Sequence, residues 1–180
     1  ALDTDLYLRI ATEIYLKRAV VGGVDRVFEM NRNFRNEGMD SSHSPEFTSL
    51  EAYEAYSDYN GMADLTRDLI QQAARDAFDL SEGEEIVRLA DGTEYDLSGQ
   101  WDRIDLYGST SEALGEEITV ETPRETLVKY AERIGLEVDD YAVSGKIVED
   151  IFEELVASKL WAPTFVYDFP EDTSPLTRYH

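Results

Sequence analysis

The sequence has 180 residues, and its 16 Lys and Arg against 39 Asp and Glu give a formal net charge of -23 at pH 7. An apolar share of 42% with 11% aromatic residues is too high for a disordered chain, so we expect a folded and very acidic protein. Its charge excludes non-specific binding to nucleic acid, and the lack of cysteine excludes disulfides and thiolate metal sites. Any RNA contact must be local or come from segments outside the chain.

The sequence also bears on location and completeness. No stretch approaches the roughly 20 apolar residues that span a bilayer, and the first residues lack the features of a signal peptide. We therefore expect no membrane segment and a cytoplasmic protein. Because the chain starts on Ala1 and ends on His180 just after a turn-rich stretch, we expect a piece of a longer protein.

The first third of the chain predicts a helix and a β-hairpin. Residues 6–10 suit a short strand, and Thr12 can cap a helix that ends at Gly22. Residues 27–35 and 47–56 alternate polar and apolar side chains, and the loop 36–46 between them is rich in Gly, Ser and Asp. This order predicts two antiparallel strands.

The remainder predicts further helices and short strands. The spacing of apolar residues predicts a helix over 61–78 with a stripe of Met62, Leu65, Leu69, Ala73 and Ala77. The Asp91-Gly92 turn predicts a hairpin over residues 84–98, and Thr122-Pro123 predicts the start of a helix that ends at Gly135. Further along, we expect an acidic amphipathic helix over residues 144–160 and a strand over residues 164–169. We expect an α+β fold in which Trp101, Trp161 and Phe165 are packing residues.

Charged residues on the strand faces of residues 9–56 indicate a site. Such faces also carry large apolar groups and are usually half buried, where an unpaired charge is costly. Glu13, Arg35, Glu37 and Glu51 together therefore suggest a polar pocket. A solvent-facing side of an antiparallel sheet would give the same pattern, and the pattern leaves both open.

Several blocks of the sequence are recognisable: FRNEG (34–38), HSPEFT (43–48), EAY (51–53), RIATEIYLK (9–17) and, more loosely, TSPL (173–176). These blocks resemble the class II aminoacyl-tRNA synthetases, in the version carried by the bacterial lysine-specific members. Their order and spacing match the second signature motif of the family and the segment before it. The resemblance implies an incomplete class II catalytic fold, an antiparallel sheet with flanking helices.

The family's chemistry implies roles for four residues around ATP. In that chemistry the amino-acid carboxylate attacks the α-phosphorus of ATP, and the aminoacyl group of the adenylate then passes to tRNA. Arg35 matches the catalytic arginine that touches both the α-phosphate and the substrate carboxylate. By the same correspondence Glu37 accepts from the adenine amino group, Phe47 stacks on the adenine ring, and His43 lies near the outer phosphates.

The amino-acid pocket is also implied by the resemblance. Lysine carries two amines and one carboxylate, so its site needs two acidic partners and one basic partner. Glu13 matches the residue that faces the α-amino group, Arg35 the one that faces the carboxylate, and Glu51 with the Tyr53 hydroxyl the group that binds the side-chain ammonium. The resemblance thus implies a lysine–tRNA ligase activity.

The resemblance sets the expected domain and partners. We expect residues 1–180 to be part of one catalytic domain, with a motif core over 1–80, an insertion-like hairpin and helices over 81–160, and a return strand over 161–180. We expect the anticodon-binding domain, the first motif and the third motif to lie outside the chain. The third motif carries the Mg²⁺ ligands of the family, so these ligands are also expected outside it. We expect this piece alone to be inactive, and the full-length protein to be a homodimer that uses lysine, ATP and the acceptor end of tRNA.

Three other functions fit parts of the sequence. An aspartate or asparagine enzyme of the same class would not favour Glu51 at the end of its pocket. A lysyltransferase paralogue that modifies a translation factor tends to carry an acid at the position of Gly38. A catalytically silent scaffold would not explain why Arg35, Glu37, Phe47 and Glu51 occur together. Separately, the sequence departs from the family pattern at Ser44, where many family members carry Asn.

Overall fold

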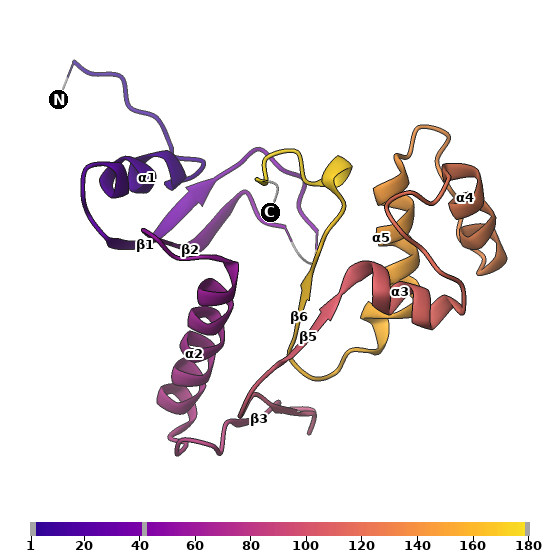
Figure 1. The fold of residues 1–180 in the computed structure, drawn as a ribbon. Helices are drawn as coiled ribbons and strands as arrows, with labels where there is room; N and C mark the ends of the chain where they lie inside the picture. Colours follow the sequence, from indigo (N-terminus) through magenta and orange to yellow (C-terminus); the bar gives the residue numbers. More distant parts are fainter. Residues whose placement is uncertain (1–2, 41–42, 179–180) are drawn as a thin grey trace. The chain divides into compact units, whose positions relative to one another are not determined.

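A computed structural model describes residues 3–40 and 43–178 of the chain. The chain divides into two compact units, Ala1–Met62 and Ala63–His180. Helices alternate with short strand pairs in an α+β arrangement (Figure 1), so the predicted fold class is confirmed. Over the two described ranges, no helix combines the length and the apolar character that crossing a membrane requires.

The N-terminal unit is built on the predicted hairpin. Helix α1 (Glu13–Val21) is followed by β1 (Arg26–Phe34) and β2 (Glu46–Glu54), which pair antiparallel. In this register Glu29 lies opposite Glu51, and Asn33 lies opposite Phe47. Both strands begin one residue earlier than predicted, and the predicted alternation of faces is confirmed.

The two faces of this hairpin differ in what covers them. Helix α1 packs against both strands and buries Leu16. On the opposite face Phe28 and Met30 are 72% and 69% exposed. The helix therefore covers only the face that carries the acidic and amide side chains.

Two predictions for the first residues were wrong. Residues 6–10 form no strand. Among the described residues, one backbone hydrogen bond, from Phe34 N to Arg9 O (2.8 Å), ties them to β1, and their apolar side chains lie exposed. Thr12 does precede α1, and its carbonyl accepts from Leu16 N. Its side chain, however, makes no capping hydrogen bond and is used elsewhere.

Helix α2 (Tyr59–Phe78) precedes a small hairpin of β3 (Ile86–Arg88) and β4 (Glu94–Asp96). Both elements were predicted, but the apolar stripe of α2 is not its buried face. Leu65 and Leu69 remain 44% and 47% exposed, whereas Ala74 is buried. Gln71 on α2 donates to the carbonyls of Leu97 and Gly99, so polar contacts connect the helix to the residues after β4.

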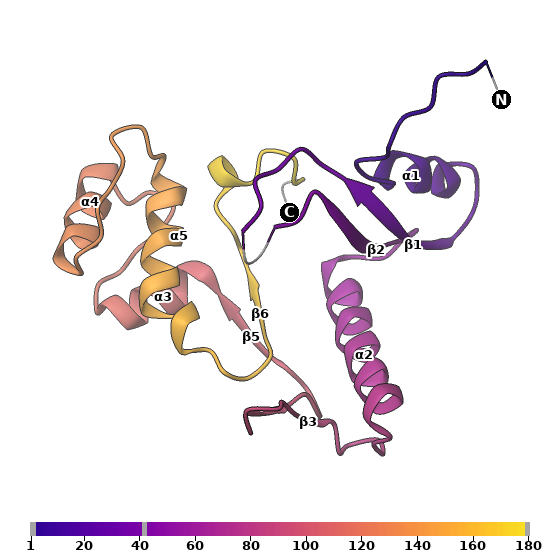
Figure 2. The same ribbon diagram turned by 180° about the vertical axis from the view of Figure 1, so that it is seen from behind.

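The C-terminal unit also contains a parallel strand pair, β5 (Asp102–Asp105) with β6 (Thr164–Tyr167). In the sequence, these two strands are separated by α3 (Leu106–Leu114), α4 (Arg124–Arg133), α5 (Ser144–Leu155) and the short 3₁₀ helix η1 (Ala157–Lys159). Figure 2 shows α3, α4 and α5 grouped together beside the strands. Their apolar faces and Ile118, from the segment between α3 and α4, form the main core, whose helical members are Leu106, Leu127, Ala131, Ile147, Val148, Ile151 and Phe152.

Several details of this unit differ from the sequence predictions. Neither β5 nor α3 was predicted, and α5 ends at Leu155, five residues early. Thr122 does not cap α4, because its hydroxyl accepts from Thr119 N. Trp101 stacks on Phe165 with ring centroids 5.4 Å apart, as packing residues do, but Trp161 is 75% exposed and the prediction for it was wrong.

The chain end returns to α5 through the 3₁₀ helix η2 (Glu171–Thr173). The Asp172 carboxylate accepts from Gly145 N at 3.0 Å, and the Thr173 hydroxyl donates to Glu149 at 2.6 Å. A Cβ atom on Gly145 would collide with the Asp172 side chain and with Pro170. Only glycine at this position therefore lets η2 lie against the start of α5.

Candidate functional site

On the face of the hairpin that α1 covers, the Glu51 carboxylate accepts three hydrogen bonds. Its Oε1 accepts from the backbone N–H of Thr12 at 3.2 Å and from the Thr12 hydroxyl at 3.1 Å. Its Oε2 accepts from the Tyr53 hydroxyl at 2.9 Å. The two residues are neighbours because alternate residues of a strand share a face. The predicted association of Glu51 with Tyr53 is thus present.

These donors keep the Glu51 carboxylate charged. Partial burial raises the pKa of Glu51, but the hydrogen bonds from Thr12 and Tyr53 outweigh it and bring the pKa below the usual value. The positive charge of Arg35 acts in the same direction. Burial, the hydrogen bond to Glu51 and nearby negative charge together raise the pKa of Tyr53 to about 12, so the phenol stays neutral.

Behind Glu51 lies a row of buried polar side chains that sequence reasoning did not identify as part of the site. Asn31 donates to the Thr12 hydroxyl at 3.0 Å, the Ser49 hydroxyl donates to Asn31 Oδ1 at 3.3 Å, and Asn33 donates to Ser49 at 2.6 Å. Thr12, Asn31 and Asn33 are 2%, 8% and 1% exposed. The alternation of β1 placed both asparagines on the polar face, but nothing local in the sequence indicated a partner in residues before α1.

Arg35 and Phe47 form a second part of the same face. The guanidinium carbon of Arg35 lies 5.0 Å from the centre of the Phe47 ring, a cation–π arrangement. Arg35 Nε donates to Ile10 O at 3.1 Å, and its Nη1 lies 3.9 Å from Glu37 Oε1. The Arg35 and Glu37 side chains are 46% and 43% exposed, so both remain accessible to a ligand.

Glu13 is the first residue of α1, and it lies near enough to Tyr53 for its charge to act on the phenol. It forms an ion pair with Lys17 one turn along the helix, and Lys17 Nζ lies 5.8 Å from the centre of the Tyr53 ring. The charge of Glu13 contributes to the raised pKa of Tyr53. Glu13 thus carries a negative charge near the Glu51–Tyr53 pair and is half exposed.

His43, the remaining residue predicted for the site, contacts Asp40 in the loop between the two strands. Its Nδ1 lies 2.9 Å from both carboxylate oxygens of Asp40, and its backbone N–H donates to the same carboxylate at 2.8 Å. Both side chains are more than half exposed. Their loop connects β1 to β2, and the described contacts of His43 are to Asp40 alone.

The arrangement presents opposite charges on and beside the face of the hairpin that α1 covers. Glu51 and Glu13 supply negative charge at the Tyr53 end, and Arg35 supplies positive charge beside the Phe47 ring. Such a face can hold a small molecule that has a cationic end and an anionic end, next to a ring that offers an aromatic surface.

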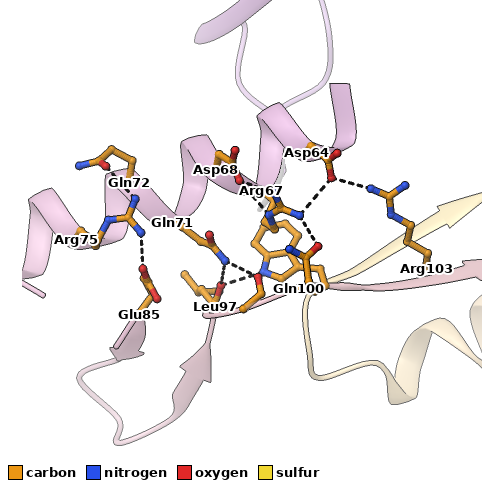
Figure 3. Close-up of polar contacts among 12 residues, drawn as sticks. Asp64, Arg67, Asp68, Gln71, Gln72, Arg75, Glu85, Leu97, Gln100 and Arg103 are labelled. Carbon is orange, nitrogen blue, oxygen red and sulfur yellow. Dashed lines mark hydrogen bonds and ion pairs between the residues drawn. The ribbon is translucent and has the colours of Figure 1, made fainter. Parts of the chain in front are cut away.

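A second polar cluster lies in the C-terminal unit, and its arginines are paired with carboxylates of the same cluster. Figure 3 shows Arg67 on α2, which contacts Asp64, Asp68 and Gln100, and Arg75, which is paired with Glu85. Glu85 is 1% exposed and also accepts from Gly83 N. Arg75 on α2 pairs with Glu85 just before β3, so this cluster joins the helix to the β3–β4 hairpin.

Comparison with known proteins identifies the family. Residues 1–180 match the family of tRNA synthetases class II (D, K and N). The chain therefore belongs to the class II tRNA synthetases, as the resemblance of its motifs implied. Its α+β fold is an incomplete class II catalytic fold.

The individual relatives are more specific. A lysine–tRNA ligase of Kineococcus radiotolerans is 58% identical over 181 residues, and one of Mycolicibacterium gilvum is 59% identical over 182 residues. Both matches cover the whole chain but 35% and 36% of the relatives. A lysylphosphatidylglycerol biosynthesis bifunctional protein of Mycolicibacterium vanbaalenii is 48% identical and is matched over 16% of its length. The chain thus spans about a third of the ligases that it resembles.

Proposed function

We propose that the chain supplies the amino-acid and ATP pocket of a lysine–tRNA ligase, as part of one catalytic domain that includes residues 1–180. The observation that carries the proposal is the Glu51 carboxylate, held charged by Thr12 and Tyr53 on the strand face that also bears Arg35. The names of the relatives agree with this proposal.

Lysine fits the charges of this face. Glu51 and the Tyr53 hydroxyl would receive the side-chain ammonium, and Glu13 would face the α-amino group. A neutral analogue would leave the Glu51 carboxylate without its cationic partner, which gives selectivity against such analogues. Arg35 would hold the lysine carboxylate, and its 46% exposure leaves it free to do so.

ATP would occupy the end of the face near Phe47. The ring would stack on adenine, Glu37 would accept from the adenine amino group, and His43 would act near the outer phosphates. In adenylate formation the carboxylate forms the new bond to the α-phosphorus and pyrophosphate leaves. Because the lysine carboxylate is already ionised, no protein nucleophile is needed, and Arg35 contributes by aligning it and neutralising phosphoryl charge.

The Mg²⁺ that accompanies ATP in such chemistry finds no set of ligands among the described residues. Over residues 3–40 and 43–178, no three His, Asp or Glu side chains converge as a metal site. The metal ligands, the contact with the acceptor end of tRNA and the homodimer would belong to the full-length cytoplasmic protein.

The test is amino-acid-dependent pyrophosphate exchange by the full-length protein. We expect stimulation by lysine, loss of exchange in Arg35→Ala, and a rise of about a hundredfold in the KM for lysine in Glu51→Gln, because that variant loses a charged partner. Arg32→Ala is the matched control, because Arg32 is exposed on the opposite face and paired with Glu46. Stimulation by aspartate, or exchange that survives Arg35→Ala, would overturn the proposal.

The acceptor of the lysyl group needs a second measurement. Transfer of labelled lysine to tRNA supports the ligase. Transfer to a translation factor without transfer to tRNA would favour the lysyltransferase alternative, in which the same pocket activates lysine for a protein.

A further inference from the structure

The hydrogen bonds behind Glu51 form one directed chain. Asn33 donates to Ser49, Ser49 donates to Asn31, and Asn31 donates to Thr12. The last donor, the Thr12 hydroxyl, then donates to Glu51 Oε1. Because Asn31 occupies the acceptor position of the Thr12 hydroxyl, the hydroxyl proton is directed to the carboxylate. Successive donors polarise one another, which strengthens the final bond.

The chain also determines which part of Glu51 remains for a ligand. A carboxylate oxygen accepts about two hydrogen bonds, and Oε1 already accepts both the N–H and the hydroxyl of Thr12. Over the described residues, Oε2 accepts from Tyr53 alone. One acceptor position of Glu51 therefore stays open, on the oxygen that also contacts the Tyr53 hydroxyl.

We propose that Thr12 is a positioning residue that holds the Glu51 carboxylate in the orientation that receives the lysine ammonium, with Asn31 fixing the direction of the Thr12 hydroxyl. The inference rests on the proposed function. It assigns a role in amino-acid binding to a residue that precedes α1 and does not cap it with its side chain. Thr12 is 2% exposed, so it acts through Glu51 rather than by contact with lysine.

The test compares Thr12→Val and Thr12→Ser in pyrophosphate exchange by the full-length protein. Valine keeps the branched shape and the backbone N–H but removes the hydroxyl, so we expect the KM for lysine to rise about tenfold. The KM for ATP should change less than about twofold, and serine should restore the KM for lysine to within about threefold of wild type. Thr48→Val is the matched control, because Thr48 is exposed on the other face of β2.

The outcomes separate this inference from the function on which it rests. If the wild type responds to lysine and Thr12→Val leaves the KM for lysine unchanged, or raises both KM values alike, the positioning role is wrong and the ligase stands. If the wild type responds to another amino acid, both fail. Should Thr12→Val not fold, as judged by circular dichroism, Thr12→Ala removes the same hydroxyl with less bulk and is held to the same result.

Discussion

Replacing Ile151 by alanine tests whether the three-helix core holds the C-terminal unit together. Ile151 lies on α5, is 0% exposed and belongs to the core formed by α3, α4 and α5. The substitution removes about three methylene equivalents, which at about 0.8 kcal/mol each gives about 2.5 kcal/mol of lost transfer free energy. A cavity in a close-packed site adds to this, so we expect a loss of about 3 to 4 kcal/mol in the free energy of unfolding.

The assay is urea unfolding of the 180-residue chain, followed by circular dichroism. Ile151→Val, which removes a single methylene, should cost about 1 kcal/mol, so the two variants form a graded pair. Val120→Ala is the matched control, because Val120 is 74% exposed and its truncation should change stability by no more than about 0.5 kcal/mol. A loss in Ile151→Ala no larger than in Val120→Ala would refute the assignment of this core.

Two further predictions concern Gly145 and Glu51. Gly145→Ala should destabilise the chain by about 2 kcal/mol in the same assay, because the added Cβ overlaps Asp172. The control Gly38→Ala should not, because nothing lies within 4 Å of its added Cβ. Equal effects of the two substitutions would contradict the packing of η2 on α5. The pKa of Glu51 lies below its ordinary value of 4.5, so its ionised form contributes stability that is present above that pH and lost as the pH falls through the lower folded-state pKa. The stability difference between wild type and Glu51→Gln should therefore shrink below about pH 4.5, and a difference that widens in acid would contradict the hydrogen bonds to Glu51.

Local patterns in the sequence were sufficient for the hairpin that carries the site. The alternation along β1 and β2 determines which side chains share a face, and it placed Phe47, Glu51 and Tyr53 together. Glycines predicted the ends of elements for a similar reason, as at Gly135, whose φ of 87° follows the end of α4. These features depend on neighbours in sequence, and for that reason they could be predicted.

Features that depend on distant residues could not be predicted in the same way. The hydrogen bonds of Thr12 reach Glu51, 39 residues away, so the usual capping preference of threonine gave the wrong partner for its side chain. The apolar stripe of α2 was correct as a pattern, but Leu65 and Leu69 stay exposed because the contacts of α2 with the residues around β3 and β4 are made by polar side chains such as Gln71. The roles of Glu13, Arg35, Glu37, His43, Phe47, Glu51 and Tyr53 toward ligands remain predictions.

The parallel pairing of β5 with β6 has a consequence for how the C-terminal unit folds. Residues that pair across these strands are about sixty positions apart, so joining them early would carry a large loop-closure entropy before any contact repaid it. The contacts among α3, α4 and α5 span shorter stretches of chain and can form first. Once those helices have collapsed, the ends of β5 and β6 are already near each other. In kinetic terms, we expect this strand pair to form late in the folding of the unit and not to nucleate it.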